Sequence, residues 1–172
     1  VLTRKQAITV TVLGWFVIGI FAAIPLYLSG HFSSTFDAYF EVISGLTTTG
    51  FSVAQDLDHL SYADNMWRFM MHFIGGQGVV VIAVSLGVFG KSGTSLYTAE
   101  GRSEHVLPNI KATTQFIGTV AAVVTTLGTL ALMTICIMQG FDPVHAFFNG
   151  LWVTLGCYDT AGFSPHSTSI IY

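Results

Sequence analysis

Three long apolar stretches, nearly free of charge, alternate with two shorter ones along the chain. The long stretches cover residues 8–28, 69–89 and 114–138. A helix needs about 20 apolar residues to cross a bilayer, so each stretch predicts a membrane-spanning helix. The shorter stretches, residues 36–46 and 143–155, are too short to cross. They predict re-entrant segments or buried helices.

Helix start signals precede both short stretches. Hydroxyl side chains at positions 33–35 can cap a helix that begins at residue 36. Asp142 followed by Pro143 places proline at a first helical position. We interpret Asp37 and Asp142 as caps or first-turn acids, because a negative charge complements the positive end of a helix.

A polar turn that contains glycine follows each short stretch, at residues 47–52 and 159–164. Placing Gly50 on Gly162 shifts the chain by 112 residues. The same shift aligns three further identical pairs, namely Thr48 with Thr160, Phe51 with Phe163 and Ser52 with Ser164. Internal repetition of this kind predicts a repeated architecture.

The order of these segments predicts an all-α, polytopic membrane protein built from repeated span–pore helix–filter–span units. Residues 1–90 form the first repeat, residues 91–113 a cytoplasmic connector, and residues 114–172 a second repeat truncated after its filter. Because the chain begins at Val1 and stops inside an apolar stretch at Tyr172, we expect it to be a piece of a longer protein.

The composition agrees with a membrane and argues against other classes. The 172 residues are 52% hydrophobic and 9% charged, and the mean hydropathy is +0.66. A soluble domain carries about 25% charged residues. A soluble enzyme and a disordered chain are therefore disfavoured, and a nucleic-acid partner would need a basic patch. Cys136 and Cys157 make no disulfide framework and are interpreted as free thiols.

Charge predicts the orientation in the membrane. Five of the six basic residues fall on one side of the predicted spans, which makes that side cytoplasmic; they are Arg4, Lys5, Lys91, Arg102 and Lys111. Arg68 lies on the other side beside Trp67, and we interpret this pair as an interfacial anchor. Seven acids share that outer side, for a net charge of −6 that attracts cations.

The two polar turns have the chemistry of a selectivity filter. Irregular backbone inside a membrane is tolerated only where it is buried or lines water. A short helix that points its negative C-terminal end at the membrane centre favours a cation there. Carbonyl oxygens of the following turn can replace the water around an ion, and Gly50 and Gly162 supply unusual backbone angles.

Three motifs stand out along the chain. Residues 44–50 are Ser-Gly-Leu-Thr-Thr-Thr-Gly, Trp67-Arg68 precedes the glycine-rich residues 74–81, and residues 161–164 are Ala-Gly-Phe-Ser. In this order they resemble the first filter, the next span and the second filter of the Trk/Ktr/HKT potassium-transporter superfamily, and most closely its bacterial Trk-type pore subunits. The chain departs from the pattern at residues 157–160, where relatives more often carry Asn, and at Gln77, which replaces a more usual apolar residue.

The resemblance implies four repeats around one pore that translocates potassium across the cell (inner) membrane, without a cofactor or a catalytic residue. The resemblance also implies that glycine at both filter positions favours K⁺ over Na⁺. The implied partners are K⁺, the lipid bilayer, the remaining repeats, a second copy in a homodimer, and a cytosolic nucleotide-binding regulatory subunit that contacts the connector. Transport through a channel and symport with H⁺ or Na⁺ both stay open.

The expected filter ligands are backbone carbonyls at matching places in the two repeats: Thr48, Thr49 and Gly50, with Thr160, Ala161 and Gly162. Four flanking residues are further candidates, namely Thr47, Phe51, Asp159 and Phe163. Glu41 either bonds the backbone behind the filter or adds charge to its vestibule.

Other polar and small residues have structural interpretations. We interpret His72 and Gln77 as bonding a neighbouring helix, although intramembrane polar groups are functional candidates. Gly75, Gly76 and Gly78 predict a helix-packing face. The alternatives to a transporter are a multi-pass membrane enzyme that uses His72 or His145 with an acid, and a non-conducting scaffold.

Overall fold

The computed structural model describes residues 4–85, 110–160 and 162–168. Helices are its only regular elements in that part of the chain. Their bounds are α1 (Arg4–Leu28), α2 (Thr35–Leu46), α3 (Tyr62–Ser85), α5 (Ile110–Met138) and α6 (Pro143–Tyr158). The predicted all-helical class is confirmed for these residues.

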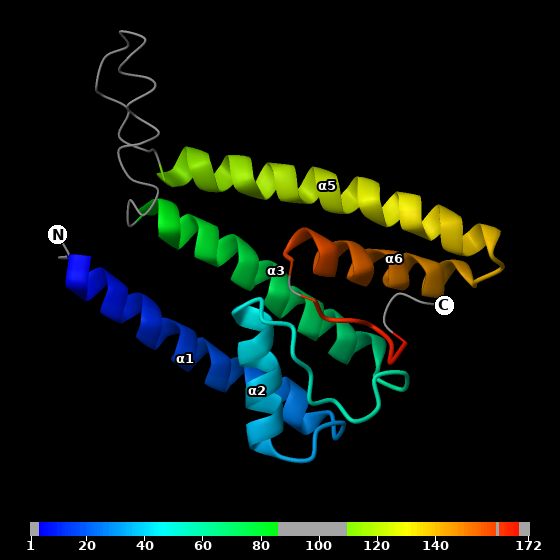
Figure 1. Cartoon of the computed structure of the whole chain (residues 1–172), viewed down its shortest axis with the longest axis horizontal. Coiled ribbons are helices and arrows are strands. Elements are labelled where there is room, and N and C mark those ends of the chain that lie inside the picture. Colours follow the sequence, from blue (N-terminus) through cyan, green and yellow to red (C-terminus); the bar gives the residue numbers. More distant parts are fainter. Residues whose placement is uncertain (1–3, 86–109, 161, 169–172) are drawn as a thin grey trace, which may run out of the picture.

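Helix α3 lies between two pairs of helices, α1 with α2 and α5 with α6 (Figure 1). Each pair consists of a long helix followed by a short one. The predicted connector, residues 91–113, lies for the most part outside the described residues. Its expected contact with a regulatory subunit therefore stays a prediction.

The five predicted helical segments are all present, with shifted ends. Helices α1 and α5 begin at Arg4 and Ile110, one turn before their uncharged stretches. Helix α6 continues to Tyr158. The largest difference is at α3, which begins at Tyr62 instead of residue 69.

Caps of the predicted kind begin both short helices. The Ser34 hydroxyl accepts a hydrogen bond from the Asp37 backbone N–H at 3.1 Å. Asp142 caps α6, where its carboxylate accepts from the N–H of Val144 at 3.0 Å and Pro143 is the first helical residue. Both cap predictions are confirmed.

A reciprocal cap explains the early start of α3. The Ser61 hydroxyl accepts from the Asp64 backbone N–H at 3.0 Å and donates to the Asp64 carboxylate at 2.8 Å. This cap satisfies one of the backbone N–H groups that a helix start leaves unpaired, and the second bond holds the Ser61 hydroxyl in place. Tyr62 then stacks on Phe148 of α6, with ring centroids 4.9 Å apart, so the first turn of α3 is also held by packing.

Two adjacent glycines bring α3 against the ends of both short helices. A Cβ at Gly75 would overlap the carbonyl group of Leu46, the last residue of α2. A Cβ at Gly76 would lie 2.6 Å from the Asp159 carboxylate, at the end of α6. The predicted packing role is confirmed for these two. Gly78 makes a looser approach, since a Cβ there would only meet Trp15 at 3.9 Å.

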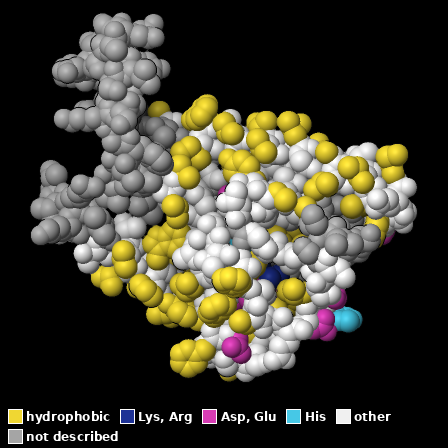
Figure 2. Space-filling view, viewed as in Figure 1, with side chains coloured by type: hydrophobic (Ala, Val, Ile, Leu, Met, Phe, Trp, Pro, Cys, Tyr) yellow, Lys and Arg dark blue, Asp and Glu magenta, His cyan; other side chains and the backbone are white. Residues whose placement is uncertain are grey.

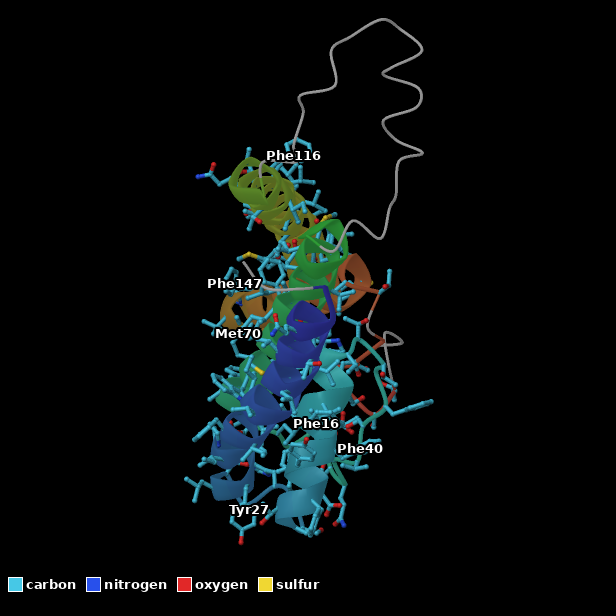
Figure 3. The ribbon with its side chains drawn as sticks, turned by 90° about the vertical axis from the view of Figure 1, so that its left-hand side faces the viewer. Phe16, Tyr27, Phe40, Met70, Phe116 and Phe147 are labelled. Atoms are coloured by element: carbon cyan, nitrogen blue, oxygen red, sulfur yellow. The ribbon has the colours of Figure 1, made fainter. Side chains whose placement is uncertain are left out.

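Much of the outer surface is apolar. Among the described residues, two segments are long and apolar enough to cross a membrane, Thr9–Leu28 and Thr114–Met138, and only 22% and 11% of their most hydrophobic windows are buried. The third predicted span is described only up to Ser85, and this part of α3 does not meet the same criterion of length and hydropathy. Hydrophobic side chains are spread over the face seen in Figure 2, whereas most of the visible acidic side chains lie along its lower part, with histidine at the lower right. The labelled side chains of Figure 3, such as Phe16, Tyr27 and Phe116, point outward from several helices.

Replacing Gly75 by Ala in the full-length protein is expected to destabilise it by about 1–3 kcal/mol, because the added methyl group has backbone in its way. Gly78→Ala adds the same methyl group three residues away, where space exists, and gains up to about 1 kcal/mol of helix propensity. Thermal unfolding of the two purified variants in detergent makes the comparison. Equal midpoints would contradict the close packing of α3 on α2.

Candidate functional site

The turn after α2 has an unusual backbone. The helix ends in two hydrogen bonds typical of a left-handed C-terminal cap, from the Thr48 N–H to the Gly45 carbonyl and from the Thr49 N–H to the Ser44 carbonyl, each 2.9 Å long. Thr48 accordingly has a positive φ of 53°, and Gly50 follows with a φ of 80°. Helix caps of this kind usually carry glycine where this chain has Thr48.

The turn after α6 has the same backbone at the equivalent positions. Thr160 has a φ of 52° and Gly162 a φ of 76°, and the Thr160 N–H donates to the Cys157 carbonyl at 3.3 Å. A β-branched residue at positive φ is a conformational outlier that costs about 1–3 kcal/mol. Thr48 and Thr160 are the only such non-glycine residues in the described chain. The repeat found in the sequence therefore extends to two strained residues at equivalent places.

The two turns lie next to each other. A Cβ built on Gly162 would lie 3.9 Å from the Cα of Gly50, so the backbones approach at the two glycines. The Thr47 hydroxyl donates to the Ile43 carbonyl and bonds the Thr49 hydroxyl, both at 2.8 Å, which supports the first turn from its side. Of the expected filter ligands, Thr48, Thr49, Gly50, Thr160 and Gly162 thus belong to two adjacent turns, and Ala161 lies outside the described residues.

A buried ion pair stands behind the first turn. The Nε atom of Arg68 donates to Oε1 of Glu41 at 2.7 Å, and both side chains are fully buried. Glu41 also accepts from the Ser52 hydroxyl at 2.8 Å and from the Val53 backbone N–H at 2.9 Å. Of the two roles left open for Glu41, bonding the chain behind the turn is therefore the one observed.

Arg68 also reaches the second turn. Its Nη1 donates to Asn65 at 2.8 Å, its Nη2 donates to the Ser52 hydroxyl at 3.2 Å, and its guanidinium carbon lies 4.4 Å from the centre of the Phe163 ring. The interpretation of Arg68 as an interfacial anchor is wrong, because the early start of α3 places this side chain inside the protein. Its neighbour Trp67 donates to the Ala22 carbonyl at 2.9 Å and is half-buried.

The equivalent phenylalanines of the two turns have opposite surroundings. Phe163 is 6% exposed and packs on α3, with its ring centre 3.9 Å from that of His72. Phe51 is 68% exposed. Phe163 thus fastens the second turn to α3, whereas no described element covers Phe51.

Gln77 and His72, both expected to form hydrogen bonds to a neighbouring helix, differ in whether they do so. Gln77 donates to the Asp159 carboxylate at 3.3 Å, as expected. His72 is fully buried, and neither ring nitrogen has a hydrogen-bond partner among the described residues. The interpretation of His72 as a hydrogen-bonding residue is therefore wrong for the described chain, where its contacts are with the rings of Phe69 and Phe163.

A second connection joins the loops that follow the two turns. The Asp58 carboxylate accepts from the Ser167 backbone N–H at 3.1 Å, from the Ser167 hydroxyl, and lies 3.4 Å from Nδ1 of His166. The bonds from Ser167 lower the pKa of Asp58 below its ordinary value, with a smaller effect of His166. Burial lowers the pKa of His166, against the influence of Asp58.

A cavity of about 530 Å³ opens beside the two turns. Thr48 and Thr160 line it together with α3, α5 and the end of α6. On α3 its lining includes Gln77, and at the end of α6 it includes Asp159. The cavity therefore lies against both strained residues, toward the ends of α3 and α5 that the connector joins.

Comparison with known proteins agrees with these features. A family model described as a TrkH-type cation transport protein matches residues 2–172. The chain belongs to the TrkH family of cation transport proteins. The predicted resemblance is thereby confirmed.

TrkH-family relatives match along nearly the whole chain. It is 34% identical to the Trk system potassium uptake protein TrkH of Escherichia coli K12 and 35% identical to that of Halomonas elongata. It is 32% identical to an uncharacterized cation transporter of Methanocaldococcus jannaschii. Each alignment covers 99% of this chain and 35% of the relative, so the chain spans about a third of the length of these relatives.

Glu41→Gln in the full-length protein is expected to lower its stability by about 3–5 kcal/mol, because the change leaves the buried Arg68 charge uncompensated. Asp37→Asn is the matched control on the same helix; it removes a first-turn acid worth about 0.3–1 kcal/mol. The midpoint of thermal unfolding in detergent compares the two. If Glu41→Gln unfolds no earlier than Asp37→Asn, the ion pair is not what holds the first turn.

Proposed function

We propose that this protein translocates potassium ions and that its two adjacent turns form half of the selectivity filter. The observation that carries the proposal is the repeated backbone, with Thr48 and Gly50 matched by Thr160 and Gly162 at positive φ in turns that touch. The relatives from Escherichia coli and Halomonas elongata are potassium uptake proteins, which supports K⁺ as the ion.

The mechanism is exchange of water for carbonyl oxygens. The C-terminal ends of α2 and α6 precede the two turns, and each helix carries a partial negative charge at that end. Carbonyls of residues 48–50 and 160–162 replace part of the hydration shell of K⁺, and the other repeats of the longer relatives complete the ring. No covalent bond forms or breaks in this process.

The contrast between Phe51 and Phe163 supports a ring of repeats. Phe163 packs on α3, the second long helix of the preceding repeat. If each such phenylalanine packs on the second long helix of the repeat before it, Phe51 requires that helix from another repeat. This explains why the Phe51 side chain is exposed here. In a closed ring of four repeats the last one supplies that helix, so repeat one is preceded in space by repeat four.

We further place the protein in the cell membrane as a multi-pass chain. The apolar surface of α1 and α5 fits contact with lipid or with the missing repeats. Homodimerisation stays a prediction from the family resemblance.

The two alternative functions gain no support from the geometry. A membrane enzyme that uses His72 needs a carboxylate within hydrogen-bond reach, and His72 has no hydrogen-bond partner in the described chain. His145 bonds the Tyr62 hydroxyl at 3.1 Å. A scaffold in which the short helices merely fill space does not need two strained turns at equivalent places.

Gly50→Ser in the full-length protein is expected to lower the preference for K⁺ over Na⁺, because serine strains a backbone with a φ of 80° and shifts its carbonyls. Gly162→Ser should act in the same direction. Gly30→Ser is the matched control, since Gly30 has a φ of 78° with open space around it and lies between α1 and α2. The measurement is K⁺ and Na⁺ uptake by cells that lack other K⁺ uptake systems.

The control separates backbone strain from filter geometry. Gly30→Ser should reduce expression at most and leave the ion preference unchanged. An unchanged K⁺/Na⁺ ratio in Gly50→Ser at normal expression would show that Gly50 does not line the pathway. A falling ratio in Gly30→Ser as well would trace the effect to strain alone.

The loop between α2 and α3 is expected outside the cell and the connector inside, as the distribution of basic residues predicts. Single cysteines are introduced by Asp56→Cys and Ser92→Cys in a full-length protein whose other cysteines are replaced. A membrane-impermeant thiol reagent should label the first variant in intact cells and the second only after permeabilisation. The reverse pattern would invert the topology.

A further inference from the structure

We propose that Asp159, together with Gln77, forms a monovalent-cation site in the cavity beside the filter turns, separate from the carbonyls of the filter itself. The site rests on the proposed function, because the ion it takes is the transported K⁺. Its ligands are side-chain oxygens, one carboxylate and one amide, which are suitable ligands for hard cations.

One oxygen of the Asp159 carboxylate accepts a hydrogen bond, and the other has no donor among the described residues. Asp159 as a residue is 7% exposed, and its Oδ1 accepts from Nε2 of Gln77 at 3.3 Å. Oδ2 of Asp159 and Oε1 of Gln77 are both buried without a hydrogen-bond partner among the described residues. Gly76 makes this position possible, because a Cβ there would lie 2.6 Å from Oδ1. Two acceptor oxygens with no donor are what a cation requires.

The surroundings of the carboxylate favour a positive charge. Asp159 caps the C-terminal end of α6, where the helix carries partial negative charge and an acid is unfavourable. Within the described residues no basic side chain pairs with it, and the buried Arg68 is already paired with Glu41. A buried charge is costly unless it is paired or binds an ion. The transported cation is the counter-charge that this position lacks.

The cavity gives an ion access to the site. Asp159 and Gln77 both line the cavity of about 530 Å³, as do Thr48 and Thr160 of the two turns. A water molecule takes about 30 Å³ of liquid, so the cavity has room for an ion with part of its hydration shell. By the predicted orientation the cavity lies on the cytoplasmic side of the turns. An ion that leaves the filter would therefore meet this site next.

The test measures equilibrium binding of ⁸⁶Rb⁺, a K⁺ substitute, to the purified full-length protein in a buffer of large organic cations. Asp159→Asn keeps the shape and removes the charge, and it should weaken Rb⁺ binding at least about fivefold, since a unit charge near 4 Å is worth about 1 kcal/mol even in water. Gln77→Leu should weaken it less. Asp142→Asn, at the opposite end of α6, is the control and should leave the affinity within about twofold.

An unchanged Rb⁺ affinity in Asp159→Asn would overturn the proposal and indicate a neutral carboxyl group. If Asp159→Asn does not fold, Asp159→Thr takes its place, because Thr47 fills the equivalent cap position in the first repeat. An unchanged Rb⁺ affinity in Asp159→Thr would likewise overturn the proposal.

Two different measurements separate this site from the filter. Asp159→Asn is judged by equilibrium Rb⁺ binding, whereas Gly50→Ser is judged by the K⁺/Na⁺ uptake ratio, which it should lower. Weaker Rb⁺ binding in Asp159→Asn with no effect of Gly50→Ser on the ratio would retain the side-chain site and reject the filter placement. The opposite pair of results would retain the filter and reject this site.

Discussion

The buried pair of Arg68 and Glu41 is the interaction on which the arrangement of the two turns depends. It joins α3 to α2, holds the chain after the first turn through Ser52 and Val53, and places a cation on the ring of Phe163 in the second. Two buried charges are costly, and such a pair is tolerated when further hydrogen bonds satisfy the remaining donors and acceptors. Here Asn65 and Ser52 each accept a further hydrogen bond from the guanidinium. The pair therefore fixes position more than it adds stability.

Helix α3 contacts both short helices because its faces are divided between them. Met71 and Gly75, four residues apart, meet the end of α2 at Gly45 and Leu46. His72 and Gly76, also four apart, meet Phe163 and Asp159 of the second repeat. Residues spaced by four lie one above the other on a helix, so these are two adjacent stripes. Arg68 lies one helical turn before both stripes. Its side chain can therefore contact both the chain that follows α2 and the chain that follows α6.

Local signals in the sequence were sufficient for the helices, their caps and the repeat. Ser34 and Asp142 cap where hydroxyl and acid side chains precede apolar runs, and Gly50 and Gly162 have the positive φ that their turns require. Contacts distant in sequence were not predictable in this way. Glu41 and Arg68 are 27 residues apart, and their pairing depends on an α3 that begins at Tyr62. The Ser61–Asp64 cap signals that start and was missed, which left Arg68 outside the predicted span.

Identical residues in the two repeats also acquire different roles from their neighbours. Phe51 and Phe163 occupy equivalent positions after α2 and α6, yet within the described chain Phe163 packs on α3 whereas Phe51 is exposed.

The strain at Thr48 and Thr160 is the remaining feature that needs a physical reason. Glycine would adopt the same φ without strain, so each threonine adds a local cost to folding that its surroundings must offset. A strained residue persists only where its surroundings determine its conformation. Around Thr48 these are the bonds to the Gly45 and Ser44 carbonyls, the hydroxyl contacts of Thr47, and the ion pair behind Ser52. The second turn has instead the packing of Phe163 on α3 and the contact between Asp159 and Gln77. The same backbone is thus held by different side chains in the two repeats. The backbone, rather than any one side chain, is therefore the feature that the two repeats share.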